Sequence, residues 1–278
     1  DLKNAEYSQS GSLTSFDSDG FTIGSAGGVS SSFPRVAWAW KGLDHDRNLA
    51  AINTDGNIPS LVSANPEAGF SIITYSPNNT VGMSIGHGLS QAPQIVFTKR
   101  LDTSQDWGVY TNVSTGNTTT NWLSLNDADA YGSGNYMTLN TATLELPQTG
   151  AFWASASSNQ VAYCWHPVSG YSSIGTYTGN GSTTGPSVTV GFRPSWVLIK
   201  KTSDTGSWYI FDAERAGSTT AFPKMLYANL NNAEYNTTGT AYDGMVITTT
   251  ATTFEVDFSS AWTDLNASGS TYLYMAFK

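Results

Sequence analysis

The chain has 278 residues, a formal net charge of −9 at pH 7 and only 12% charged residues. Its 12 basic residues are scattered, which argues against binding to nucleic acid, and no apolar run approaches the ~20 residues that cross a bilayer. Abundant Gly, Ser, Thr and Asn, with 13% aromatic residues, favour an all-β protein with many turns.

Short sequence motifs of the amino-terminal stretch occur again near the end of the chain. DLKNAEY at the start matches NLNNAEY at 229–235, and RVAWAWK (35–41) matches TYLYMAFK (271–278). We therefore expect residues 1–41 to be the C-terminal half of a β-sandwich repeat. Its other half would precede residue 1 in a longer protein, or these residues would pack against another part of this chain or a neighbour. DSDG (17–20) lacks the later ligands of a calcium loop and is interpreted as a turn before the strand FTIG.

The next stretch, residues 42–68, is polar and contains proline, so we expect a linker laid over the surface. Within it, Asp44, His45 and Asp46 offer one nitrogen and two oxygens to a cation. Adjacent residues of a loop seldom converge on one ion. We therefore interpret this group as a solvated loop and predict no metal site.

Two full copies of one unit follow, at residues 69–168 and 169–278. The copies match best in their first halves, where Lys99 aligns with Lys200 and Trp107 with Trp208. Both tryptophans occupy matching strand positions, so we expect both to be core residues.

The predicted strands are short segments of β-branched and aromatic residues, bounded by Gly, Pro, Asn and Asp. They include QIVFTK, WVLIKK, WYIFD, TFEVDF and TYLYMAF. Only residues 42–52 and 122–130 offer room for a turn or two of helix. The predicted fold is all-β: tandem antiparallel β-sandwich repeats of jelly-roll type, two complete and one amino-terminal half.

The candidates for chemistry are few. His87 lies in a turn and His166 at a strand end, and neither accompanies a nucleophile motif. Cys164 is the single cysteine, which rules out an internal disulfide, and we expect it to be buried. The best carboxylate pair for glycoside hydrolysis is Asp212 with Glu214, but the matching stretch of the preceding repeat has no acid. We interpret that pair as a solvated turn and predict no catalytic residue and no cofactor.

Sugar binding would instead use exposed aromatic side chains that stack on sugar rings. The candidates, if they lie in loops, are Trp122, Tyr131, Tyr227 and Trp262.

The longest matching phrases are GFSIITYSPNNTVGMSIGHGLSQAPQIVFTKR, VAYCWHPVSGYSSIGTYTGNGSTTGPSVTVGFRPSWVLIKKTSDTGSWYIFDAER and GFTIGSAGGVSSSFPRVAWAWK. They resemble the repeated β-sandwich domain of unknown function of tail-fibre and other virion structural proteins of tailed phages, notably marine and cyanobacterial ones. The resemblance implies a concanavalin-A-like or jelly-roll sandwich, usually near the C-terminal end of a longer fibre or appendage protein. It assigns no catalytic residue.

The leading hypothesis is a non-catalytic tail-fibre or appendage module, located on the virion surface, that contacts a host surface glycan through its loops. Its expected partners are other virion proteins and copies of itself, with a trimer favoured. One alternative is a capsid-decorating or filament-forming scaffold without a ligand. The other is a polysaccharide depolymerase.

Overall fold

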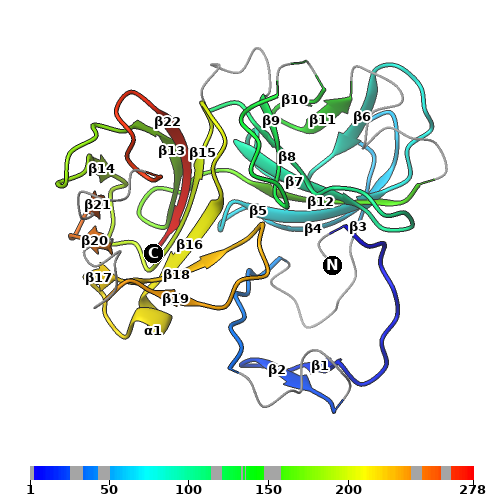
Figure 1. Ribbon diagram of the computed structural model, residues 1–278. Helices are drawn as coiled ribbons and strands as arrows, with labels where there is room; N and C mark the ends of the chain where they lie inside the picture. The colour runs from blue at the N-terminus through cyan, green and yellow to red at the C-terminus, as the bar shows by residue number, and fades with distance from the viewer. Residues whose placement is uncertain are drawn as a thin grey trace.

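Short antiparallel strands form nearly all of the regular structure in the computed structural model, which confirms the predicted all-β fold (Figure 1). The structure describes residues 3–25, 34–42, 51–113, 121–132, 134, 136–146, 158–238, 246–257 and 264–278.

The first sandwich pairs a seven-stranded sheet with a three-stranded sheet. In sheet order, the larger contains β3 (Ala51–Asn53), β4 (Ser60–Asn65), β5 (Phe70–Tyr75), β12 (Gln160–Trp165), β7 (Ile95–Arg100), β8 (Gly108–Thr111) and β9 (Asn121–Ser124). The smaller contains β10 (Thr138–Leu139), β11 (Thr143–Leu146) and β6 (Met83–Gly86). Fully buried Ile73, Met83 and Ile85 fill the space between the two sheets.

The second sandwich pairs a six-stranded sheet with a four-stranded sheet. The larger contains β13 (Ser172–Thr178), β22 (Thr271–Phe277), β15 (Trp196–Lys201), β16 (Trp208–Asp212), β18 (Lys224–Tyr227) and β19 (Tyr235–Asn236). The smaller contains β14 (Ser187–Thr189), β21 (Thr253–Asp257), β20 (Val246–Thr249) and β17 (Ala221–Phe222). The order β5-β12-β7-β8-β9 of the first sandwich matches β13-β22-β15-β16-β18 of the second.

The large sheets of the two sandwiches are buried on both faces. In β15, Val197 and Ile199 point into the second sandwich, while Leu198 points to an apolar layer that the two large sheets share. In β5, Ile73 lies inside the first sandwich and Phe70 lies in the same shared layer. This alternation explains why these strands are apolar almost throughout. We call the shared layer the junction.

The amino-terminal segment, residues 3–25 and 34–42, differs from the expected half sandwich. Its described strands are β1 (Leu13–Phe16) and β2 (Phe21–Ile23), which pair only with each other around the predicted DSDG turn. The stretch matched to the last strand of the repeat carries no described strand, although Trp38 and Trp40 pack against the junction. The segment therefore joins no large sheet, and it is held by the packing of its tryptophans together with backbone hydrogen bonds near its start, such as the one from the amide of Glu6 to the carbonyl of Leu101.

Two further expectations are corrected. Residues 42–68 are no simple surface linker, because β3 and β4 extend the seven-stranded sheet and Val62 is buried in the first core. Residues 121–124 form strand β9 instead of a helical turn. Within the described residues, the helix is α1 (Ala213–Ala216). The other segment considered for helix was 42–52, of which residues 43–50 lie outside the described residues.

Candidate functional site

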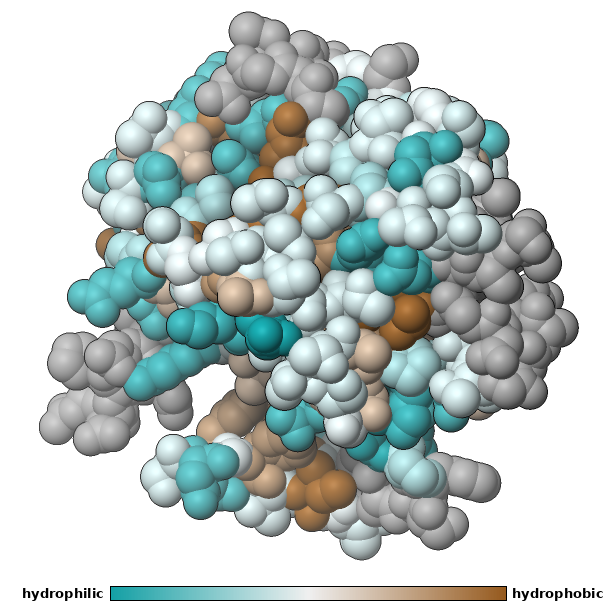
Figure 2. All heavy atoms as spheres, turned by 90° about the vertical axis from the view of Figure 1, so that its left-hand side faces the viewer, coloured by the Kyte–Doolittle hydropathy of each residue, from teal (hydrophilic) through white to brown (hydrophobic). Residues whose placement is uncertain are grey.

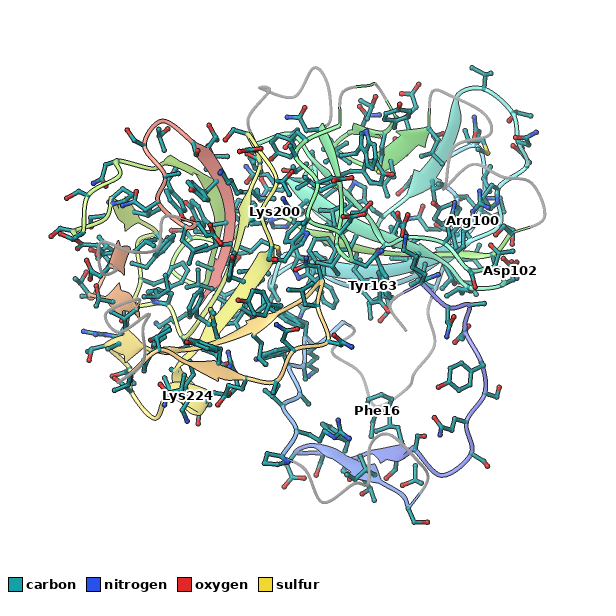
Figure 3. The ribbon with its side chains drawn as sticks, viewed as in Figure 1. Phe16, Arg100, Asp102, Tyr163, Lys200 and Lys224 are labelled. Atoms are coloured by element: carbon teal, nitrogen blue, oxygen red, sulfur yellow. The ribbon has the colours of Figure 1, made fainter. Side chains whose placement is uncertain are left out.

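A cavity of about 530 Å³ opens beside the junction, between the two large sheets and the amino-terminal segment. Its first-sandwich wall includes Phe97, Trp107 and Tyr163, and its second-sandwich wall includes Leu198 and Ile210. Figure 3 shows Phe16 of the hairpin projecting toward Tyr163 across this space, and Figure 2 shows brown and tan apolar atoms around the hollow low on the molecule. The walls are almost entirely apolar.

Aromatic rings gather around Trp40, which lines the cavity. The ring centroid of Trp40 lies 6.1 Å from that of Trp165, 5.6 Å from Trp196 and 5.6 Å from Phe277, in edge-to-face geometry. Contacts of this kind contribute about 0.5–1.5 kcal/mol each beyond the burial of area. The three tryptophans therefore tie the amino-terminal segment to both sandwiches.

Several of the few polar groups at this site are indole nitrogens. The buried Nε1 atoms of Trp38, Trp165 and Trp196 have no hydrogen-bond partner among the described residues. A sugar would need several directed polar partners, and the cavity walls offer few. The site is therefore suited to apolar side chains rather than to a glycan or a charged ligand.

A buried lysine connects the two sandwiches at the edge of the junction. The ammonium of Lys200 donates to the carbonyl oxygen of Ala128 at 3.2 Å and to that of Lys201 at 2.6 Å. The amide of Gly206 also donates to Ala128, at 2.8 Å, and the amide of Tyr131 donates to the carbonyl of Thr202 at 3.0 Å. Burial lowers the pKa of Lys200 to about 8.

The three hydrogen bonds that cross between the sandwiches have counterparts between the amino-terminal segment and the first sandwich. Lys99 donates to the carbonyl of Lys3 at 3.4 Å, Gln105 donates to the same carbonyl at 2.9 Å, and the amide of Glu6 donates to the carbonyl of Leu101 at 2.6 Å. Burial also lowers the pKa of Lys99. We call residues 99–107 and 200–208 the lysine loops.

Three chain segments stand at matching positions, because DLKNAEY matches NLNNAEY and Asn126 takes the place of Asn229, and we call them docking segments. Residues 3–6 (KNAE) and 128–131 (ADAY) are docked as described, and residues 231–234 (NNAE) form the third. Within the part of the chain that the structure describes, residues 231–234 make no backbone hydrogen bond, and all four are exposed. The third docking segment is therefore free.

The second and third docking segments are held at their starts in the same way. The amide of Trp107 donates to Oδ1 of Asn126 at 2.8 Å, and the amide of Trp208 donates to Oδ1 of Asn229 at 3.0 Å. After each segment the chain returns to pair with the strand that precedes it. Gly132 forms a β-bridge with Trp122 of β9 after the second segment, and β19 pairs with β18 after the third. The free segment is thus presented by the same local structure as the docked one.

The aromatic residues proposed for sugar stacking do not form a platform. Trp122 packs on the first core and meets Tyr136 edge-on, with ring centroids 6.1 Å apart. Tyr131 packs on the junction, and Tyr227 packs on the second core. None of these three is exposed, and Trp262 lies outside the described residues.

The carboxylate pair is divided between two environments. Asp212 is buried, begins helix α1 as its N-cap and accepts a hydrogen bond from the amide of Arg215 at 2.8 Å. It also forms an ion pair with the Arg215 guanidinium, whereas Glu214 is exposed. The expected solvated turn is wrong for Asp212, because a helix cap and an arginine hold its carboxylate inside.

The other candidates have structural contacts. His87 is buried. Its Nδ1 accepts a hydrogen bond from the amide of Leu89, and its Nε2 lies within hydrogen-bond distance of the carbonyl oxygen of Asn140, at 3.1 Å in each case. Burial lowers its pKa, which favours the neutral ring. Cys164 is a buried free cysteine, as expected. His45 lies outside the described residues.

Neither a metal-binding cluster nor a membrane-crossing helix is present among the described residues. In this part of the chain, no group of three or more His, Cys, Asp or Glu side chains is placed to hold a metal ion. No helix of the described residues has the length and apolar character required to cross a membrane.

The lysine contacts were missed by sequence reasoning, although the alignment contained their signal. Lys99 and Lys200 align, each stands at the end of an apolar strand, and each is followed by a loop that leads to a tryptophan. A charge repeated at the same position of two apolar strands calls for a repeated partner. Its partners are main-chain carbonyls far along the chain, which no local pattern reveals.

Comparison with known proteins gives one family. The family model described as "Domain of unknown function (DUF7483)" matches residues 1–278. No curated protein and no solved structure matches the chain. The amino-terminal segment, the two sandwiches and their junction thus fall within one family unit, and the chain belongs to the DUF7483 family of domains of unknown function.

Proposed function

We propose that the chain is a non-catalytic structural module of a tailed-phage virion, in a tail fibre or another appendage. The observation that carries the proposal is the junction, where the two large sheets share one buried apolar layer. An interface that resembles a protein core is typical of permanent contacts, whereas domains that move against each other meet through smaller and more polar surfaces. A stiff pair of sandwiches suits a part that transmits or resists force.

Contact with the host surface is the second element of the proposal. The described aromatic candidates are packed, so such contact would use polar loops at the sandwich ends. The loop before β6 is one example, because Asn78, Asn79 and Thr80 are all exposed. A glycan array with the full chain tests this element. If the chain binds none of the host polysaccharides on the array, the scaffold alternative is favoured.

The depolymerase alternative has weaker support, because Asp212 is engaged by Arg215 and separated from the exposed Glu214. Incubation of host polysaccharide with the full chain should release no new reducing ends. Release that is lost in Asp212→Asn, with the fold retained, would establish an enzyme instead.

Immunogold labelling of intact virions whose genome encodes this chain tests the proposal directly. We expect gold particles at fibres or other tail appendages, and labelling of the capsid shell would favour the decorating scaffold. Absence of the chain from purified virions would contradict both. Light scattering on the purified chain tests the favoured trimer, and a monomer at micromolar concentration would remove it.

A further inference from the structure

Each lysine loop described in this chain has a docking segment, but one docking segment has no lysine loop. The amides of Glu6 and Tyr131 each donate to a loop carbonyl, and Glu234 occupies the matching position in the free segment. Its carboxylate is paired with Arg215 at 3.0 Å, whereas its amide makes no hydrogen bond within the described residues. Nearby Leu230 is 41% exposed, which leaves an apolar side chain beside the free segment.

The cavity marks a second unfilled position in the same arrangement. Trp208 is fully buried and donates its indole N–H to the carbonyl of Ser124 at 2.9 Å, across the junction between the sandwiches. The matching Trp107 is only partly buried and lines the cavity. Among the described residues, no strand therefore takes the place over Trp107 that β9, which supplies Ser124, takes over Trp208.

The amino-terminal segment supplies part of a third unit at this place. Trp40 matches Trp165 and Phe277 in the aligned final strands, and its ring contacts both of theirs, with centroids 6.1 Å and 5.6 Å apart. Residues 3–6 dock on the first lysine loop as residues 128–131 dock on the second. The segment thus makes the contacts of a third unit's C-terminal half.

We propose that the cavity and residues 231–234 form one docking surface for a further half-sandwich of this repeat, with the strand pattern of β13, β15, β16 and β18. A half-sandwich attached directly before Asp1 would be in register for this surface, because Asp1 aligns with Asn229, two residues after β18 ends. Its lysine loop engages the free segment, and its apolar face covers the cavity. The proposal does not depend on the proposed virion function.

The contacts of the proposed half-sandwich follow from the two docked segments. Its lysine and a loop amide donate to the carbonyl of Asn231, and a loop carbonyl accepts the amide of Glu234. The strand matching β18 ends beside Trp107 and offers a carbonyl to its indole N–H, as Ser124 does for Trp208. Its outward apolar side chains face Phe97 and Tyr163, which line the cavity.

An extended chain tests the proposal with sequence that the protein already contains. A copy of residues 169–228 is placed directly before Asp1 of the full chain, and amide hydrogen exchange is read residue by residue. We expect exchange of the Glu234 amide to slow by at least about 10-fold, and the indole N–H resonance of Trp107 to shift. Unchanged exchange at Glu234 overturns the proposal, whether or not the added residues fold, because the reporter lies in the original chain.

A matched control separates docking from general stabilisation. In the control, the added copy of Lys200 is replaced by Met, while the native Lys200 is kept. The Glu234 amide should then exchange faster than in the unaltered extension, with exchange at Tyr131 unaffected. Equal protection in both extensions would overturn the proposed lysine contact. Protection of Glu234 that instead rises with the concentration of the unextended chain would assign the surface to a second copy.

Discussion

Two tryptophans at matching positions have different surroundings, although the strands that carry them are paired in the same way. Trp208 is fully buried against the first sandwich, whereas Trp107 faces the cavity. The local fold is therefore not what buries this residue. Burial depends on the neighbouring sandwich, and the difference shows that contacts between the sandwiches complete the packing that each core begins.

The largest expected effect comes from truncating the two tryptophans. Trp208→Ala should reduce the free energy of unfolding by about 3–5 kcal/mol, because it leaves a large void and removes the indole hydrogen bond to the Ser124 carbonyl. Trp107→Ala should cost about 1–2 kcal/mol, because its ring already faces a cavity. Urea unfolding at neutral pH measures both. Equal losses of unfolding free energy in the two variants would contradict the difference in burial between Trp208 and Trp107.

The next effect concerns pH and the buried lysine. Because the pKa of Lys200 falls to about 8 in the folded chain from 10.5, the unfolded chain binds more protons between these values, and stability from this group rises with pH. From pH 7 to 9.5 the wild type should gain about 2 kcal/mol relative to Lys200→Met. The variant shares all tyrosines, so their titration cancels. A constant difference between the two proteins would show that Lys200 is not desolvated.

A smaller effect distinguishes the two asparagines that present the docking segments. Asn229→Ala should cost about 2 kcal/mol, because it leaves the amide of the buried Trp208 without an acceptor. Asn126→Ala should cost about 1 kcal/mol, because water can reach the partly buried Trp107. Thermal unfolding of both variants gives the comparison. A larger loss in Asn126→Ala would contradict the account.

The smallest effect is expected at the hairpin. Phe16 is 79% exposed, so Phe16→Ser should change the free energy of unfolding by less than about 0.5 kcal/mol. Urea unfolding of this variant is the measurement. A loss above 1 kcal/mol would mean that the hairpin closes over the cavity in solution.

The sequence predicted the strands of the two sandwiches well, because β-branched and aromatic runs between turn residues carry local information. WVLIKK and TYLYMAF are strands, close to their predicted bounds. The segment SLVSAN was missed, since only Val62 of its apolar residues is fully buried and the stretch reads as polar. The repeat count and the domain bounds stay predictions.

The site was less predictable than the fold. Its essential contacts run from a lysine ammonium to a main-chain carbonyl of another unit, and any residue can supply that carbonyl. The sequence of residues 128–131 therefore shows nothing of its role. Aromatic residues were candidates for ligand contacts on the condition that they lie exposed in loops, but Tyr131 and Tyr227 pack on apolar layers, where large rings contribute most.

Amide hydrogen exchange of the unmodified chain tests the central claim most directly, because Tyr131 and Glu234 hold matching positions in a docked and a free segment. The account predicts that the amide of Tyr131, which donates to Thr202, exchanges at least about 100-fold more slowly than the amide of Glu234. Equal exchange at the two positions would contradict it, because the contact between the sandwiches would then protect nothing.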